Sequence, residues 1–75
     1  MPISGITVQV RKQELDKVRE TIAARSDAEV VRTEGPYLVV VLEAATREQV
    51  KSAFQEIAQM PGVVTAEVAY YSEEV

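Results

Sequence analysis

Apolar and polar residues alternate at the start of the chain in the pattern of a half-buried strand. Ile6, Val8 and Val10 recur at every second position, with polar residues between them. Successive side chains of a strand point to opposite faces of a sheet. This period in a β-branched run therefore predicts a strand over Ile3–Val10 with one buried face.

Two longer segments carry apolar residues at the spacing of an amphipathic helix. In each segment these residues form one stripe, with charged residues between them. The stripe consists of Leu15, Val18 and Ile22 within Lys12–Arg25, and of Val50, Ala53, Phe54 and Ile57 after Thr46. Thr46 and Gln49 fit a capping box, in which each side chain bonds the backbone amide of the other residue. Pro61-Gly62 is expected to close the second helix.

Three further segments are predicted to be strands. They are Ala28–Thr33, Leu38–Glu43 and Val63–Tyr71, and a turn at Glu34-Gly35-Pro36 separates the first two. Gly35 is expected to supply a positive φ in that turn.

The patterns also predict which face of the sheet each residue of these strands points to. Ala28 and Val30 are expected to face inward, which places Glu29 and Thr33 in solvent. The unbroken apolar run over residues 38–42 indicates burial on both faces, or one buried face and one exposed apolar face. Alternation in the last strand places Val64, Ala66, Val68 and Tyr70 on one face, and Val63, Thr65, Glu67, Ala69 and Tyr71 on the other. We expect Tyr70 to be half-buried in the core.

The order of predicted elements is strand, helix, strand, repeated once. The two halves are weakly similar at an offset of 35 residues, which aligns Leu15 with Val50 and Ile22 with Ile57. This order predicts a ferredoxin-like α+β fold (βαββαβ), with a four-stranded antiparallel sheet in the order 4-1-3-2 and both helices on one face. We expect a single domain over residues 1–75, with a polar, frayed tail at about 72–75.

The composition argues against an enzyme. A chain of 75 residues has little room for a buried active-site cavity beside its core. It contains no Cys and no His, which removes the usual ligands of transition metals and the commonest nucleophile–base pairs. We therefore expect no catalytic residues, no metal site and no cofactor.

The charge balance indicates the kind of partner. With a formal net charge of −4, one Phe and no Trp, the chain is poorly suited to nucleic acid and better suited to a basic partner. Its longest uncharged apolar run, Tyr37–Leu42, is far shorter than the ~20 residues of a membrane span. The first residues lack the features of a signal peptide, so a cytoplasmic location is expected.

The predicted layout leaves one face of the sheet without helices. If Val40 and Leu42 face the helices, the alternate residues of the same strand point to the other face. This face is predicted to carry Thr7, Gln9, Val39, Val41, Glu43, Thr65, Glu67, Ala69 and Tyr71. An exposed apolar patch flanked by carboxylates is typical of an interface. The alternative is an ordinary surface, because β-branched residues suit any strand and most carboxylates are simply solvated.

Three segments of the chain also resemble a known family. They are Ile3–Arg11 (ISGITVQVR), Leu38–Ala44 (LVVVLEA) and Met60–Val64 (MPGVV), the last followed by Ala69-Tyr70. In their order and spacing they are similar to the NapD family, the maturation chaperones of periplasmic nitrate reductase. The resemblance covers nearly the whole chain, although family members often carry His where this chain has Tyr71.

The resemblance implies a function. Members of this family bind the twin-arginine signal peptide of the nitrate reductase catalytic subunit and hold back export until the molybdenum cofactor is loaded. The peptide is thought to bind as a helix on the open sheet face. In this chain Val39 and Val41 would then contact the apolar side of the peptide, and Glu43 or Glu67 would meet its arginines. Addition of the peptide at a strand edge is the alternative mode.

Two other classes of function share this fold. A regulatory domain of the amino-acid-sensing ACT type would bind a small ligand near Arg11-Lys12, although that loop lacks the glycine such a site tends to need. A structural subunit would instead use the open face to form a homodimer.

Overall fold

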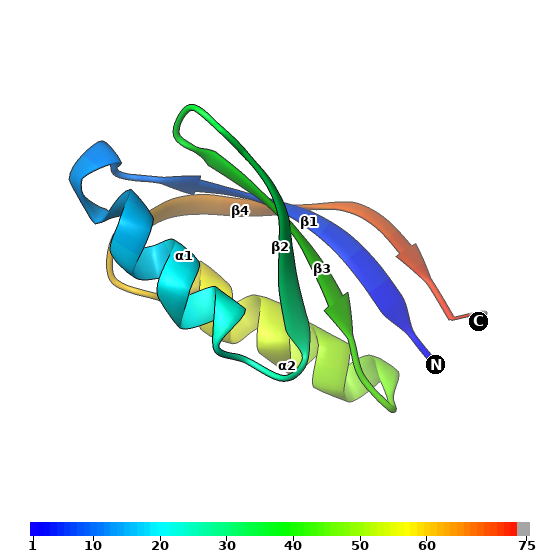
Figure 1. The fold of residues 1–75 in the computed structure, drawn as a ribbon. Helices are drawn as coiled ribbons and strands as arrows, with labels where there is room; N and C mark the ends of the chain where they lie inside the picture. The colour runs from blue at the N-terminus through cyan, green and yellow to red at the C-terminus, as the bar shows by residue number, and fades with distance from the viewer. Residues whose placement is uncertain (74–75) are drawn as a thin grey trace.

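The elements of the computed structural model, which describes residues 1–73, follow the predicted order. The strands are β1 (Ile3–Val10), β2 (Ala28–Glu34), β3 (Tyr37–Glu43) and β4 (Val63–Ser72). The helices are α1 (Leu15–Ala23) and α2 (Arg47–Ala58). A 3-10 turn, η1 (Lys12–Glu14), precedes α1. The four strands form one antiparallel sheet in the order β2-β3-β1-β4, as predicted. Both helices lie against one face of it, so the fold is ferredoxin-like (Figure 1).

The first helix and the C-terminal tail differ most from prediction, while β2, β3 and β4 each differ by one residue at one end. The first helix was expected over Lys12–Arg25, but Lys12–Glu14 form a 3-10 turn, as is common at helix ends, and α1 runs from Leu15 to Ala23. The tail was expected to fray from Ser72, which instead ends β4 opposite Ile3. Residues 74–75 of that predicted tail lie outside the described residues.

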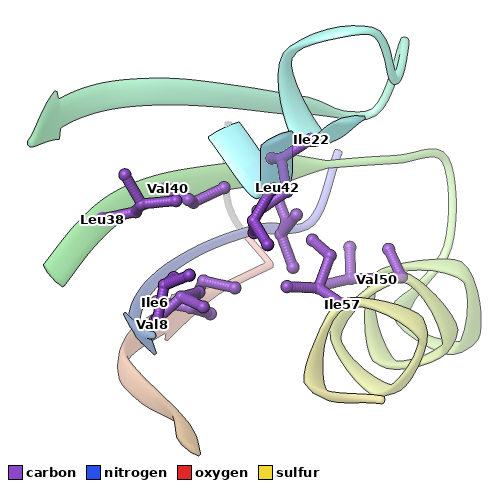
Figure 2. Close-up of a cluster of buried hydrophobic side chains, with 11 residues drawn as sticks. Ile6, Val8, Ile22, Leu38, Val40, Leu42, Val50 and Ile57 are labelled. Carbon is purple, nitrogen blue, oxygen red and sulfur yellow. The ribbon is translucent and has the colours of Figure 1, made fainter. Parts of the chain in front are cut away.

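The core lies between the sheet and the two helices (Figure 2). It contains the apolar stripes of both helices together with alternate residues of β1 and β3. Its buried members are Ile6, Val8, Val10, Val18, Ile22, Leu38, Val40, Leu42, Val50, Ala53 and Ile57. Val40 and Leu42 face the helices as predicted, which leaves the odd-numbered residues of β3 on the opposite face.

Helix α2 begins at the predicted capping box. The Gln49 backbone amide donates to the Thr46 hydroxyl at 3.1 Å, and the Gln49 side-chain oxygen accepts from the Thr46 amide at 3.3 Å. These bonds satisfy two amides that the helix itself leaves without partners. The start of α2, near the end of the sheet where β1 begins and β4 ends, is therefore set by local sequence (Figure 1).

The hairpin between β2 and β3 also follows its local sequence. Gly35 has a φ of 57°, the positive value predicted for it, and the two-residue connection Gly35-Pro36 joins the strands directly. The Val10 amide donates to the Pro36 carbonyl at 2.8 Å, which ties this hairpin to the end of β1.

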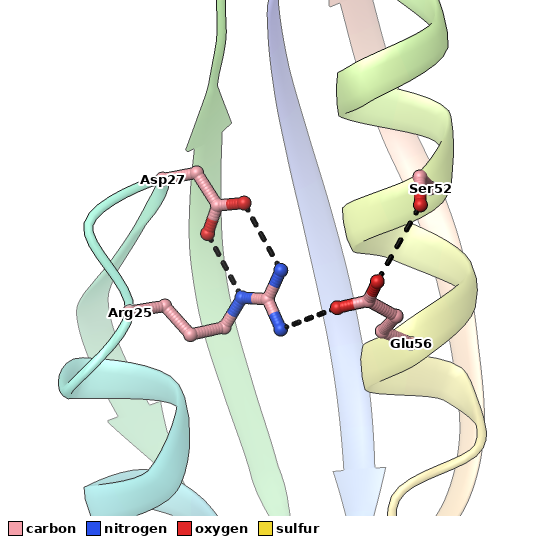
Figure 3. A network of polar contacts seen from close by, with 4 residues as sticks. All are labelled: Arg25, Asp27, Ser52 and Glu56. Carbon is pink, nitrogen blue, oxygen red and sulfur yellow. Dashed lines mark hydrogen bonds and ion pairs between the residues drawn. The ribbon is translucent and has the colours of Figure 1, made fainter.

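An ion-pair network links the segment just after α1 to α2 (Figure 3). Arg25, just after α1, donates two hydrogen bonds to Asp27 at 2.8 and 3.0 Å and a third to Glu56 of α2 at 2.8 Å. These bonds from Arg25 lower the pKa of Asp27. The bidentate geometry and partial burial make this pair stronger than an ordinary surface ion pair.

Replacing Asp27 by Asn is expected to lower the free energy of unfolding at pH 7 by about 1 kcal/mol. Because the folded-state pKa lies below the ordinary 3.8, this stabilisation is present above pH 3.8 and is lost as the pH falls through the folded-state value. Urea unfolding of both proteins across pH 2–7 should therefore show two curves that converge in acid. Asp16→Asn, which removes an exposed ion pair with Arg19, is the control and should cost less; a pH-independent gap for Asp27→Asn would contradict the account.

Candidate functional site

The face of the sheet that carries no helix is the candidate site, and we call it the open face. The strand register arranges its residues in four rows, each running from the β2 edge toward the β4 edge. The rows are Glu43–Ile3–Ser72; Glu29–Val41–Gly5–Tyr70; Arg32–Val39–Thr7–Glu67; and Glu34–Tyr37–Gln9–Thr65. Seven of the nine predicted site residues lie on this face: Thr7, Gln9, Val39, Val41, Glu43, Thr65 and Glu67.

The open face is strongly acidic. Its described residues include four glutamates and one arginine, a formal net charge of −3 in a chain of net charge −4. The arginine, Arg32, is paired with Glu34. Among the described residues Glu29, Glu43 and Glu67 form no ion pair. These three carboxylates attract cations to the face, since no cation within residues 1–73 forms an ion pair with them.

Two of the unpaired carboxylates line the same recess. Glu29 and Glu43 flank Val41 at the corner where β2 begins and β3 ends, around a hollow of about 240 Å³. We call this the acidic recess. Asp27 also lines it, but that carboxylate is held by Arg25. Val41 and the two free carboxylates together suit an arginine side chain, whose stem is apolar and whose guanidinium head is cationic.

The centre of the open face is apolar. Val39 and Val41 occupy the middle rows and are half-buried by their neighbours, so they are less exposed than the sequence pattern suggested. Two tyrosines border these valines: Tyr37, 42% exposed, lies in the row next to Val39, and Tyr70, 51% exposed, lies at the β4 end of the row of Val41. The face therefore offers an apolar strip with aromatic groups at two of its corners, bordered by carboxylates.

Both predicted tyrosine positions are wrong. Tyr71 was expected on the open face, but it pairs with the buried Ser4 and lies on the helix side, while Tyr70 pairs with Gly5 on the open face. The cause is a β-bulge: the register shifts between Gly5 and Ile6, which leaves Ala69 without a partner. An extra residue in one strand reverses the facing of every residue beyond it.

The bulge is held in place by two neighbouring residues of β1. The Ser4 hydroxyl, buried on the helix side, donates to the Tyr70 carbonyl at 2.9 Å. On the opposite side, a Cβ added to Gly5 would lie 2.2 Å from the nearest ring carbon of Tyr70. The Tyr70 ring thus lies directly over the Gly5 backbone, an arrangement that only glycine permits and that covers an otherwise bare strand position.

Replacing Gly5 by Ala is expected to destabilise the protein by about 1–2 kcal/mol, because the new methyl group displaces the Tyr70 ring. In a Tyr70→Ala background the same substitution should be neutral or stabilising by about 0.5–1 kcal/mol, since alanine is favoured over glycine in a strand. Urea unfolding of the two single variants and the double variant measures this coupling. Additive effects would show that the ring does not rest on Gly5.

Sequence reasoning missed three residues of the site. Glu29 was assigned to solvent, Tyr70 to the core, and Tyr37 was not considered. Glu29 lies beside Val41 because the β2–β3 register shifts between Val30 and Arg32, and this irregularity has no signal in a single sequence. The position of Tyr70 did have a signal in the sequence, because a glycine inside a predicted strand, here Gly5, indicates a bulge or the close approach of another group to the backbone.

The chemistry available on this face is that of binding. Among residues 1–73 no three His, Cys, Asp or Glu side chains are grouped so that they could hold a metal ion. No helix in this part of the chain is long and apolar enough to cross a membrane. Exposed apolar and aromatic groups bordered by carboxylates can contact a ligand that is itself apolar on one side and cationic on the other.

Fold and face together define a small ferredoxin-like binding domain with an acidic open sheet. Over residues 1–74 the chain matches the NapD family, described as NapD protein, and it therefore belongs to that family. Its fold is similar to the solution structure of the E. coli Tat proofreading chaperone protein NapD, with a TM-score of 0.85 and 20% sequence identity. The match covers 96% of this chain and 78% of that one. Comparison with curated protein sequences finds no match.

Proposed function

We propose that this protein is a Tat proofreading chaperone that binds a twin-arginine signal peptide on its open face. The cargo is the signal peptide of the periplasmic nitrate reductase catalytic subunit, and binding in the cytoplasm holds back export until the cofactor is loaded. Membership of the NapD family supports the general role. The observation that carries the proposal for this chain is the concentration of unpaired carboxylates around an apolar strip.

The electrostatics favour an arginine-rich ligand at one corner. The acidic recess presents Glu29 and Glu43 on either side of Val41. Arginine forms planar, bidentate hydrogen bonds with carboxylates, whereas lysine acts as a point charge. A pair of arginines placed at this recess would be distinguished from a pair of lysines by geometry as well as by charge. Glu67, at the opposite edge of the face, provides the alternative contact.

The apolar part of the peptide has a place beside this recess. Val41 leads along β3 to Val39 and then to Tyr37, while Tyr70 borders the same surface from β4. A helical peptide with an apolar stripe following its arginines would cover these residues while keeping its cationic end at the recess. Burial of this strip supplies affinity, and the carboxylates supply orientation.

A chaperone role requires no chemistry on the cargo. The described residues offer binding groups rather than an activated nucleophile, and a chaperone of this kind acts by occupying the signal peptide. Occupancy alone delays export, because a bound peptide is withheld from the translocation machinery. The protein is accordingly proposed to be a binding protein and not an enzyme.

Calorimetric titration with a twin-arginine signal peptide tests this function. A matched peptide with both arginines replaced by lysine is the control, because it preserves charge and changes geometry. We expect saturable binding of the twin-arginine peptide and at least tenfold weaker binding of the twin-lysine peptide. Equal affinity for the two peptides, or no heat of binding in a folded sample, would refute the proposal.

A further inference from the structure

A second hollow lies on the other side of the sheet, between α2 and the β4 edge. Its volume is about 450 Å³, within the usual range of small-molecule sites. Its lining is mostly apolar: Val50 and Phe54 contribute from α2, and Val68 contributes from β4. Although Val68 is on the helix side of the sheet, it remains 54% exposed. We call this the apolar hollow.

The rim of the apolar hollow is cationic in an otherwise acidic protein. Arg47 and Lys51, one turn apart on α2, both line it. Lys51 forms no ion pair within residues 1–73. Because these are two of only eight basic residues in the chain, the local charge at this hollow opposes that of the open face. The two surfaces are therefore suited to ligands of opposite charge.

A carboxylate of the protein itself is already bound to two residues that line this hollow. Glu73, just beyond β4, accepts a hydrogen bond from Arg47 and another at 3.1 Å from the Tyr71 hydroxyl. These contacts lower the pKa of Glu73, in the direction that favours its charged form. Arg47 and Tyr71 thus form a carboxylate-binding pair at the edge of an apolar surface, and Glu73 shows the position that a ligand carboxylate would take.

From this arrangement we propose that the apolar hollow binds a small amphiphilic carboxylate, with its apolar body on Phe54 and Val68 and its carboxylate at Arg47 and Lys51. The charge of the rim selects an anion, and the apolar lining selects an attached alkyl or aryl group. Glu73 then acts as an internal competitor for Arg47. This site is separate from the open face, so its occupant does not compete directly with a signal peptide.

Titration of decanoate into the labelled full chain, below the concentration at which decanoate forms micelles, tests the site. Backbone amide shifts should cluster on residues 47–54 and 66–71 and should saturate. Decanol and decyltrimethylammonium are matched probes with a neutral and a cationic head. We expect decanoate to bind about two- to fivefold more tightly than decanol, and the cationic probe to bind most weakly.

Three variants separate a built site from general adsorption. Lys51→Met should weaken decanoate binding about two- to fivefold, whereas the control Lys17→Met on α1 should leave it unchanged. Glu73→Gln should tighten binding by a similar factor, because it frees Arg47. The proposal is overturned if decanol binds as well as decanoate, if the shifts fall on the open face, or if neither Lys51→Met nor Glu73→Gln alters the affinity. Twin-arginine peptide binding by Lys51→Met should be unaffected, which keeps this test independent of the proposed function.

Discussion

Replacing Glu43 by Lys is expected to weaken binding of a twin-arginine signal peptide about tenfold, equivalent to about 1.4 kcal/mol. The substitution removes a carboxylate of the acidic recess and places a cation beside Glu29 and Val41, where the arginines are proposed to bind. The double variant Glu29→Lys/Glu43→Lys should bind more weakly still, because no unpaired carboxylate remains in the recess.

Salt dependence identifies the origin of this loss. The Debye length falls from about 10 Å at 0.1 M salt to about 3 Å at 1 M, so the difference between wild type and variant should shrink at high salt. Glu20→Lys makes the same charge change on an exposed position of α1, in the layer remote from the open face, and serves as the control. If Glu20→Lys weakens the peptide as much as Glu43→Lys does, net charge rather than the recess controls binding. If Glu43→Lys leaves the peptide affinity unchanged and Glu67→Lys weakens it, the arginines of the peptide bind at the β4 edge instead of the recess.

Truncating two adjacent residues of β3 should produce two different defects. Leu42→Ala removes a fully buried side chain from the core and should cost about 3 kcal/mol, or roughly 12–24 °C in Tm for a domain of this size. Val41→Ala lies on the open face and should cost less than about 1 kcal/mol of stability. Its expected effect is on binding, which should weaken about fivefold through lost apolar contact.

Urea unfolding and peptide calorimetry on the same two samples measure both effects. The Leu42→Ala protein should bind the peptide normally at temperatures where it remains folded, because its altered side chain points away from the ligand. A Val41→Ala protein with wild-type affinity would remove the apolar strip from the proposed binding surface. Comparable stability losses in both variants would mean that β3 is buried on both faces, the other interpretation of its continuous apolar run.

The sequence pattern predicted an element well where the element depends on residues close together in the chain. Alternation in β1 predicted its buried face, because the strand stays in register along its central residues. The capping box predicted the start of α2 for a similar reason, since the two residues involved bond each other. The fold followed from the order of such elements together with the handedness of their connections.

The site was harder to predict because it depends on contacts between distant residues. Alternation failed at both ends of β4. At its start the register shift between Gln9 and Val10 places Val63 on the helix side and leaves Val64 without a partner in β1. Beyond Val68 the bulge at Ala69 exchanges the faces of Tyr70 and Tyr71. That bulge depends on Ser4 and Gly5, which are more than sixty residues away in the chain. Glu29 entered the recess only through the pairing of β2 with β3. A single sequence carries no direct record of either contact.

Mapping a twin-arginine signal peptide onto the labelled protein by NMR tests the central claim most directly, because it reports both binding and its location. The account predicts saturable amide shifts centred on Glu29, Val39, Val41, Glu43 and Tyr70, with little change along α1 and α2. The twin-lysine peptide should produce weaker shifts at the same places. Shifts concentrated on the helices or confined to the outer edge of β2, or none at high peptide concentration, would contradict the assignment of the open face as the signal-peptide site.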